Sequence, residues 1–262
     1  MKPFSEWDFT LQRYELLCRS ILDCNYHVFK VRDYLINQKN VTHEPIIVLR
    51  HDVDRKPFHA LRMAQVEDGL GIKATYYFRV KSPSFQPEVI KKIAHLGHEI
   101  GYHYENLSDM HGNMESAIKD FEKKLKKIRE LVPISTICMH GSPLSRWNNR
   151  DLWEKYDYKD FGLIGEPYLS IDYSKIIYLT DTGRTWKGGL FNVRDRVNSK
   201  VRLEINSTLN LINTLKSKSH GQFLIQCHPE RWSSNIFQWM RSFSRDYVSN
   251  YAKIVISSRR KT

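Results

Sequence analysis

The stretch PIIVLRHDVD, residues 45–54, places a continuous apolar run of strand length directly before a group of polar residues. A short apolar run without alternation is consistent with a strand that is buried on both faces of a parallel sheet. A doubly wound sheet normally has a glycine-rich phosphate turn after its first strand. Here His51, Asp52 and Asp54 occupy that place, so the stretch favours a different parallel architecture.

Strand-like and helical segments alternate along the chain after this stretch. Six or seven such units in this length predict an α/β fold in which parallel strands form a (β/α) barrel with outer helices. The segment 168–179 is rich in β-forming residues but ambiguous. We expect strands at 74–80, 99–104, 134–139 and 222–227, and helices at 57–70, 87–96, 114–131, 149–156, 203–216 and 236–251.

The N-terminal segment precedes this alternation. Residues 5–8 can cap a helix whose apolar face includes Leu11 and Leu17, and residues 26–36 are mixed, with a short strand and a turn. No linker, repeat or low-complexity stretch divides the chain. We therefore expect a single domain over residues 1–262, with residues 1–44 as an extension packed on the barrel.

Composition narrows the class of protein. Of the 262 residues 41% are hydrophobic, which is enough to bury a core and excludes a fully disordered chain. No apolar run approaches the ~20 residues that cross a bilayer, and the first ten residues, MKPFSEWDFT, lack the apolar stretch of a signal peptide. These features predict a cytoplasmic protein without a transmembrane segment. The four cysteines form no CxxC pair, which indicates buried, reduced thiols.

The formal charge of +12 is partly concentrated at the C-terminal end, where residues 241–262 carry six basic side chains against one acid, Asp246. A basic tail can favour nucleic acid, an anionic membrane surface or an anionic substrate, and a merely solvated tail is the simpler interpretation. No nucleic-acid-binding module accompanies it. We expect no specific nucleic-acid partner and at most weak contact with anionic surfaces.

Residues that can bind a metal or transfer a proton follow the expected strands. Asp52 and Asp54 follow the first strand, and His103, His140 and His228 lie at or just after the ends of three later ones. The carboxyl ends of parallel barrel strands converge at one rim, where active sites lie. Two neighbouring carboxylates repel each other, so we expect a bound cation or a shared proton between them. A turn or a helix cap after the strand would also explain the two aspartates. An imidazole can ligate zinc, and for an isolated histidine a core position is the alternative.

The segments HDVD (51–54), ATYYF (74–78) and GHEIGYH (97–103) resemble, in their order and spacing, the polysaccharide deacetylase family of NodB-homology carbohydrate esterases. The similarity extends over about residues 46–225. It implies a distorted (β/α) barrel and the metal-dependent removal of an N- or O-acyl group from a sugar. It also implies that Asp52 is the general base, Asp54 and His103 are metal ligands, and His228 is the general acid.

The sequence departs from the family pattern at two places. The second histidine of the usual HxxxH is replaced by Leu107, which cannot ligate, and the usual Arg-Pro pair is replaced around His140 by the tetrapeptide HGSP. We expect His140 to be the third metal ligand, with Glu105 in reserve. Three protein ligands and one open position are typical of catalytic zinc, which is the metal we expect first. If neither residue reaches the metal, the site is weak or inactive.

A polar loop at residues 180–186 and a tryptophan after the last strand supply further candidates. Arg184 can pair with an anionic part of the substrate or with a catalytic carboxylate. Trp186 and Trp232 can stack on a sugar face. Packing of these two rings in the core or at the rim of the barrel explains them equally well.

These features and the resemblance together predict a metal-dependent hydrolase that removes an acyl group, N-acetyl first, from a sugar or related small amide. A nucleotide- or lipid-linked sugar precursor of a surface glycan suits the expected location. Two alternatives stay open. One is a metal-dependent glycosyltransferase that uses Asp52 and Asp54 to hold a metal–diphosphate, and the other is a non-catalytic carbohydrate-binding member of the fold.

Overall fold

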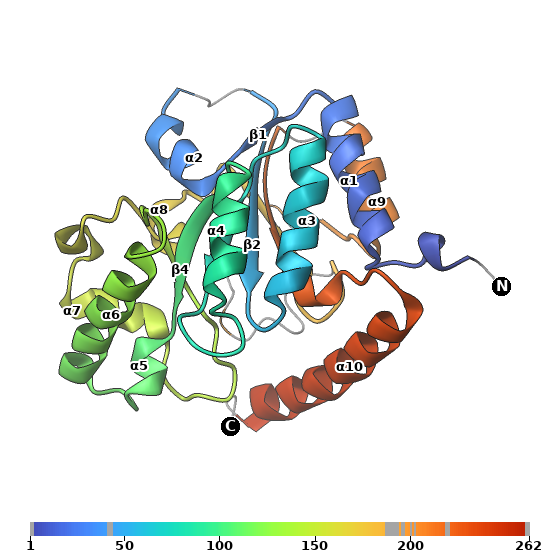
Figure 1. The fold of residues 1–262 in the computed structure, drawn as a ribbon. Coiled ribbons are helices and arrows are strands. Elements are labelled where there is room, and N and C mark those ends of the chain that lie inside the picture. The colour runs from blue at the N-terminus through green and yellow to red at the C-terminus, as the bar shows by residue number, and fades with distance from the viewer. Residues whose placement is uncertain are drawn as a thin grey trace.

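The computed structural model describes residues 3–40, 44–186, 194, 197–199, 201, 203–217 and 221–259, and the side chains of 252–259 lie outside the description. Its centre is a seven-stranded parallel sheet in the order β5-β4-β3-β2-β7-β6, with β1 paired to β2 (Figure 1). The strands are β1 (His27–Phe29), β2 (Ile46–Val53), β3 (Thr75–Phe78), β4 (Glu99–Tyr104), β5 (Ile137–Met139), β6 (Ile177–Thr180) and β7 (Gln222–Cys227).

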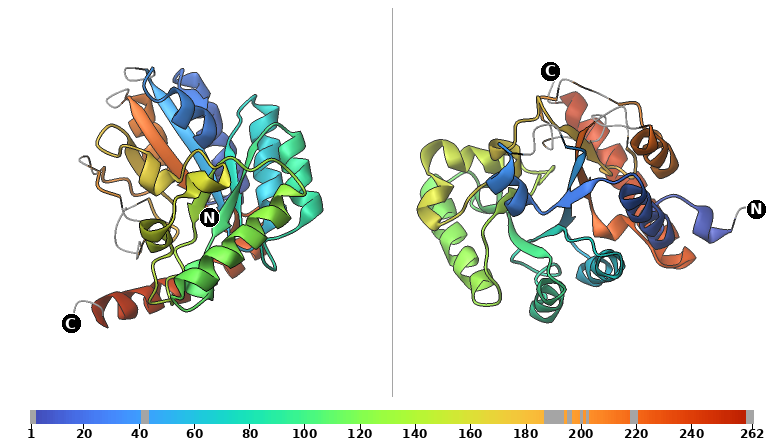
Figure 2. Two further views of the ribbon diagram at one scale, coloured as in Figure 1. Left: turned by 90° about the vertical axis from the view of Figure 1, so that its left-hand side faces the viewer. Right: turned by 90° about the horizontal axis from the view of Figure 1, so that it is seen from above.

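Helices surround the sheet on its outer side, as the view from above shows most clearly (Figure 2). The α-helices are α1 (Leu11–Asp23), α2 (Val31–Asn37), α3 (Pro57–Gly69), α4 (Pro87–His95), α5 (Asn106–Asp109), α6 (Met114–Arg129), α7 (Leu152–Lys155), α8 (Pro167–Ser170), α9 (Thr208–Lys216) and α10 (Ile236–Arg259). Short 3₁₀ turns are η1 (Phe4–Glu6), η2 (Asn149–Asp151), η3 (Tyr158–Phe161) and η4 (Pro229–Arg231). No helix within the described residues is long and apolar enough to cross a membrane.

The sheet curls into a half-barrel, which confirms the expected distorted (β/α) barrel. The two edge strands β5 and β6 are not paired with each other in the described part of the chain. Tyr168 of α8 lies between them, with its hydroxyl 3.4 Å from that of Tyr178 on β6. The same hydroxyl accepts a hydrogen bond of 2.7 Å from Arg50 Nη2 on the central strand. Side chains thus fill the concave side where a further strand pair would close a full barrel.

The central strand β2 is buried at all eight positions. Its register places Asp52 beside Tyr77 of β3 and His51 beside Cys227 of β7. Parallel pairing puts the carboxyl ends of these strands at one edge of the sheet. The polar residues that follow each strand therefore gather at that edge.

Most expected elements are present, and two strands, 99–104 and 222–227, have the expected limits. The ambiguous segment 168–179 divides between α8 and β6. In the segment 26–36, expected to be mixed with a short strand and a turn, the strand is present as β1 and a helix, α2, follows it. The expected cap at residues 5–8 is wrong. Thr10 caps α1 by accepting a hydrogen bond from Arg13 N. Asp8 instead accepts a hydrogen bond of 2.9 Å from Thr208 N, so its side chain is used in a tertiary contact and not in capping α1.

A buried polar cluster lies on the face of β2 opposite to Asp52. Its centre is Glu67 of α3, whose carboxylate lies 2.6 Å from His51 Nε2 and accepts hydrogen bonds from the hydroxyls of Tyr14 and Tyr76. Burial opposes ionisation, but His51 and His98 outweigh it and hold the pKa of Glu67 below its ordinary value. This carboxylate joins α1, α3, β2 and β3 in one network.

We expect Glu67→Gln to lower the free energy of unfolding by about 2–4 kcal/mol, because it removes the charge that several buried donors share. Urea unfolding checks this, with an unchanged m-value. The matched control is Glu88→Gln on α4, whose carboxylate is exposed and 3.9 Å from Lys91 Nζ. Equal stability of the two variants would contradict a structural role for this network.

Candidate active site

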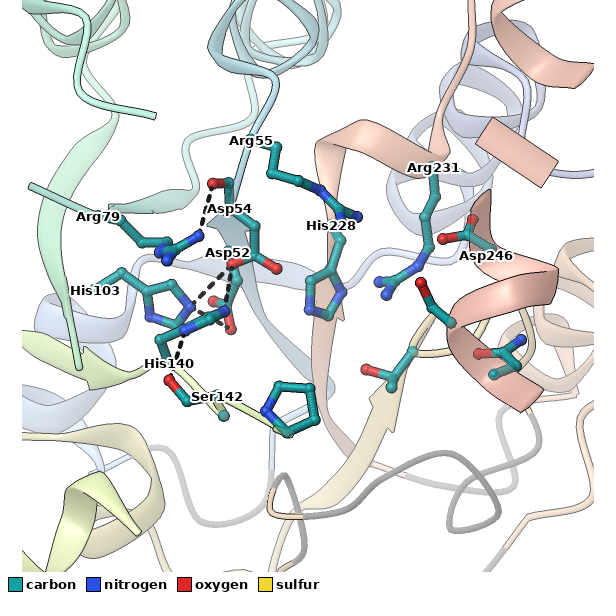
Figure 3. Close-up of a pocket in the computed structure, with 15 residues that line it drawn as sticks. Asp52, Asp54, Arg55, Arg79, His103, His140, Ser142, His228, Arg231 and Asp246 are labelled. Carbon is teal, nitrogen blue, oxygen red and sulfur yellow. Dashed lines mark hydrogen bonds and ion pairs between the residues drawn. The ribbon is translucent and has the colours of Figure 1, made fainter. Parts of the chain in front are cut away.

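A cavity of about 220 Å³ opens at the carboxyl edge of the sheet (Figure 3). Its wall draws on the ends of β2, β4, β5 and β7 and on one face of α10. The lining residues are Asp52, Asp54, Arg55, Arg79, His103, His140, Gly141, Ser142, Pro143, Thr182, His228, Arg231, Asp246, Ser249 and Asn250. Five sequence candidates, Asp52, Asp54, His103, His140 and His228, are therefore brought together.

Asp54, His103 and His140 converge at one side of the cavity (Figure 3). The Nε2 atom of His103 lies 3.4 Å from Asp54 Oδ1, and the Nε2 atom of His140 lies 3.6 Å from the same oxygen. Ligands at about 2.1 Å from a tetrahedral ion are about 3.4 Å apart. Both separations suit donors that share one divalent cation.

Each imidazole is oriented through its other nitrogen. His103 Nδ1 donates to the backbone carbonyl of Cys138 at 2.9 Å, and His140 Nδ1 lies 2.9 Å from Glu105 Oε2. A hydrogen bond of this kind selects the ring tautomer and leaves Nε2 as the lone-pair donor. Both rings are therefore set to ligate on the side that faces Asp54.

The carboxylate of Asp54 differs from the other carboxylates near the cavity. Asp52, Glu105 and Asp181 each form an ion pair with an arginine, whereas the ion pairs of Asp54 in the described residues are with imidazoles alone. Its buried Oδ1 has no hydrogen-bond partner. A buried carboxylate oxygen that faces two imidazole nitrogens and has no guanidinium partner fits a metal cation.

A second donor set overlaps with the first. One ligand atom each from Asp52, His103 and Cys138 lie within 4.8 Å of one another, and all three residues are buried. Cys138 does not line the cavity. We favour the set of Asp54, His103 and His140, because all three line the cavity and leave an open position for a reactant.

Two residues from the sequence analysis have other roles than ligation. Leu107 is buried in the apolar core. Glu105 accepts hydrogen bonds from Nε and Nη2 of Arg79, at 2.8 and 2.9 Å. It also pairs with Lys81 Nζ at 2.6 Å and with His140 Nδ1. Burial would raise the pKa of Glu105, but His140 and Arg79 hold it well below its ordinary value. Glu105 thus acts as a fixed anion that orients His140.

Asp52 is buried at the end of β2 and held by two donors. Its Oδ2 accepts a hydrogen bond from Gln226 Nε2 on the neighbouring strand β7 and lies 3.4 Å from Arg50 Nη2. The guanidinium of Arg50 is fully buried and packs over the ring of Tyr168 at 4.7 Å. The other oxygen of Asp52 has no hydrogen-bond partner. It is therefore available to accept a proton.

Figure 3 shows His228 across the cavity from the two imidazoles. Asp181, behind the cavity wall, fixes its ring. Its Nδ1 lies 2.6 Å from Asp181 Oδ1, and Arg231 Nη1 donates to the same oxygen at 2.8 Å. Trp232 Nε1 donates to Asp181 Oδ2 at 2.9 Å. Burial and Arg231 favour the neutral imidazole, but Asp181 outweighs them and raises the pKa of His228.

The structure does not bring the three expected substrate contacts to the cavity wall. Trp186 and Trp232 are each 1% exposed and pack around Phe9 in the core. Arg184 Nε pairs with Asp246 Oδ2 at 3.1 Å, and its Nη2 donates to the carbonyl of Arg231. The burial of both rings leaves no face for a sugar, so these three residues support the cavity wall from behind.

Sequence reasoning missed Arg50, Asp181, Gln226 and Arg231 as parts of the site. Two signals were present. An arginine inside an apolar strand, two residues before a carboxylate, points to the same face as that carboxylate. A polar TDTG segment (180–183) after a strand places an aspartate at the same edge as His228.

No protein-family model matches this sequence, and no curated protein does. Solved structures with a similar fold include a mutant CE4-family pseudoenzyme with restored enzymatic activity, at 13% identity, 80% of this chain, 64% of that chain and a TM-score of 0.46. A CE4 esterase from Streptococcus mutans matches at 12% identity, 87% of this chain, 88% of that chain and a TM-score of 0.45. A putative polysaccharide deacetylase from Mycobacterium smegmatis matches at 14% identity, 77% of this chain, 82% of that chain and a TM-score of 0.43. These names belong to the family that the motifs at 51–54 and 97–103 resemble.

We expect Asp181→Asn to lower the pKa of His228 by at least about one unit, because an opposite charge at hydrogen-bond distance is lost while burial and Arg231 continue to favour the neutral ring. NMR titration of the imidazole carbons measures this. The control is Asp172→Asn, a change at an exposed carboxylate on a loop. An unchanged His228 pKa in Asp181→Asn would contradict the role given to this pair.

Proposed function

We propose that this protein is a metal-dependent hydrolase that removes an acyl group, N-acetyl first, from a sugar. The observation that supports the proposal most directly is the convergence of Asp54, His103 and His140 beside a free carboxylate oxygen of Asp52, in a cavity also lined by His228. This arrangement combines a cation site, a proton acceptor and a proton donor. We further propose that residues 1–262 form one domain.

Asp54, His103 and His140 would hold a divalent transition metal, zinc first. When bound, the ion supplies a Lewis acid that polarises the acyl carbonyl and lowers the pKa of water. Cys138 and Glu105 hold the Nδ1 atoms of the two rings, so each ring would present its Nε2 atom to the ion.

Asp52 is the proposed general base. Arg50 and Gln226 hold one of its oxygens, so the other keeps a fixed direction. Asp52 would take the proton of the attacking water as the bond to the acyl carbon forms.

His228 is the proposed general acid. Asp181 keeps it protonated to a higher pH than an ordinary histidine and holds Nδ1, so Nε2 remains to act on the substrate. Donation of that proton to the leaving nitrogen completes cleavage of the amide. Activity should therefore fall as pH rises through the pKa of His228.

The wall of the cavity suits a polar substrate. Arg55, Ser142 and Asn250 supply donors around the opening, which suits the hydroxyl groups of a sugar. A nucleotide- or lipid-linked precursor of a surface glycan remains our proposed substrate class.

We expect Asp52→Asn and His228→Ala each to lower the rate of acetate release by at least about 100-fold, because each removes one proton-transfer group. The assay follows acetate from a panel of N- and O-acetylated sugars. His95→Ala, at an exposed position on α4, is the matched control and should keep wild-type activity. Wild-type rates in Asp52→Asn and His228→Ala would refute both roles, and metal-dependent binding of nucleotide sugars without hydrolysis would favour a glycosyltransferase.

We expect the purified protein to bind about one equivalent of zinc, and His140→Ala to weaken that binding at least about tenfold, because it removes one of three protein ligands. Elemental analysis and competition with a chromogenic chelator measure this. Asp52→Asn should retain the metal, and His95→Ala should match the wild type. If the metal content is unaffected by His140→Ala but is lost in Cys138→Ala, the ligands are instead Asp52, His103 and Cys138.

A further inference from the structure

The last described helix, α10, exposes an apolar face at the carboxyl edge of the sheet. Of the large hydrophobic side chains exposed in the described residues, six belong to this helix, including Phe237 at 81% and Tyr247 at 69% exposure. With 3.6 residues per turn, Phe237, Met240, Val248 and the two tyrosines project from the same side. The members of the α10 apolar face are Phe237, Met240, Phe243, Tyr247, Val248 and Tyr251.

The opposite face of α10 is fixed to the active-site cavity. Asp246 and Asn250 line the cavity, and they bind Arg184 Nε and the carbonyl of Gly183 respectively. Ser242 Oγ donates to the carbonyl of Glu230 at 2.7 Å. Figure 1 shows α10 lying across the edge to which the arrow of β2 points. One side of the helix thus forms the wall of the cavity while the other side faces solvent.

A cluster of cations borders the apolar face. Arg241 and Arg245 are exposed on α10, and Arg55 and Lys56 follow β2 at the same edge. Burial first, and then the positive charges of Arg245, Arg55 and Arg241, lower the pKa of Lys56, although Glu230 opposes the shift. Arg55 pairs with Glu230 at 3.3 Å, so Lys56, Arg241 and Arg245 are the cations of this cluster that are left to attract an anionic surface.

Two further apolar side chains are exposed at this edge. Phe58 lies in the first turn of α3, three residues after Arg55, and Leu144 directly follows the cavity-lining residues 141–143. The apolar side chains are therefore distributed around the mouth of the cavity and not on α10 alone.

We propose that this edge of the protein docks on an anionic lipid surface, with the α10 apolar face in the headgroup region and the cation cluster on lipid phosphates. Aromatic and aliphatic side chains on one side of a helix, bordered by arginines, are the features of an interfacial helix. The docked orientation turns the cavity mouth toward the lipid. The proposal goes beyond hydrolysis itself, because the docked protein would hold its active site next to substrates that are anchored in the membrane.

A second copy of this chain fits the same face less well. In a twofold dimer the patch meets itself, so Arg241 and Arg245 would oppose their own copies. The only acid in the sequence of α10, Asp246, is buried on the inner face. Phosphate headgroups supply the negative charge that a second copy lacks.

Flotation with phosphatidylcholine vesicles and with mixed phosphatidylcholine–phosphatidylglycerol vesicles tests the proposal. The wild-type chain should bind the mixed vesicles at least about tenfold more tightly, and added salt should weaken this binding. Arg241→Gln with Arg245→Gln should weaken it about 25-fold, at about fivefold for each cation. Phe237→Ser with Tyr247→Ser should reduce it at least about tenfold.

The matched control is Ile36→Ser with Leu209→Ser, which removes exposed apolar side chains from α2 and α9 and should bind as the wild type does. Asp52→Asn should also bind normally, which separates docking from hydrolysis. Absence of wild-type binding, or equal losses in the control, would overturn the proposal. A dimer in light scattering that Phe237→Ser with Tyr247→Ser dissociates, without vesicle binding, would assign the face to a second copy.

Discussion

Three consecutive polar residues, Arg50, His51 and Asp52, are buried on the central strand of this protein. Buried charges are tolerated only when they are paired and hydrogen-bonded, so the surrounding structure must supply partners on both faces of the strand. On one face Arg50 and Asp52, two positions apart, pair with each other. On the other face His51 meets Glu67 of α3. The arrangement of α1, α3, β7 and α8 around β2 follows from these requirements.

The same principle continues around the cavity, where carboxylates are matched to guanidinium groups. The ion pairs are Asp52 with Arg50, Glu105 with Arg79, Asp181 with Arg231 and Asp246 with Arg184. Asp54 forms its ion pairs in the described chain only with His103 and His140. The guanidinium partners hold those carboxylates in place, whereas the carboxylate without a guanidinium partner is the one suited to a metal. The pattern of pairing therefore separates the roles of chemically identical side chains.

His140 and Leu107 lie at the ends of neighbouring segments of the chain but in different surroundings. Leu107 lies in the core on α5, and His140 from the end of β5 reaches Asp54 instead. The strands β4 and β5 are adjacent and parallel, so a residue after either one approaches the same point. Glu105 and Ser142 then orient the ring of His140. The end of β5 thus brings His140 to the same side of the cavity as His103 from β4.

Local patterns in the sequence were sufficient to predict the parallel α/β class, most element positions, and the five polar residues that gather at the strand ends. These follow from local patterns, because apolar runs, periodicity and the order of strands along the chain are properties of neighbouring residues. Four outcomes depended on the three-dimensional packing: which carboxylate has which partner, the burial of Trp186 and Trp232 in the core, the capping of α1 by Thr10, and the apolar face that α10 exposes beside the cavity. Those outcomes depend on contacts between residues far apart in the sequence, such as Asp8 with Thr208 and Asp52 with Gln226, and the pairing of buried charges in three dimensions is not encoded in any single segment.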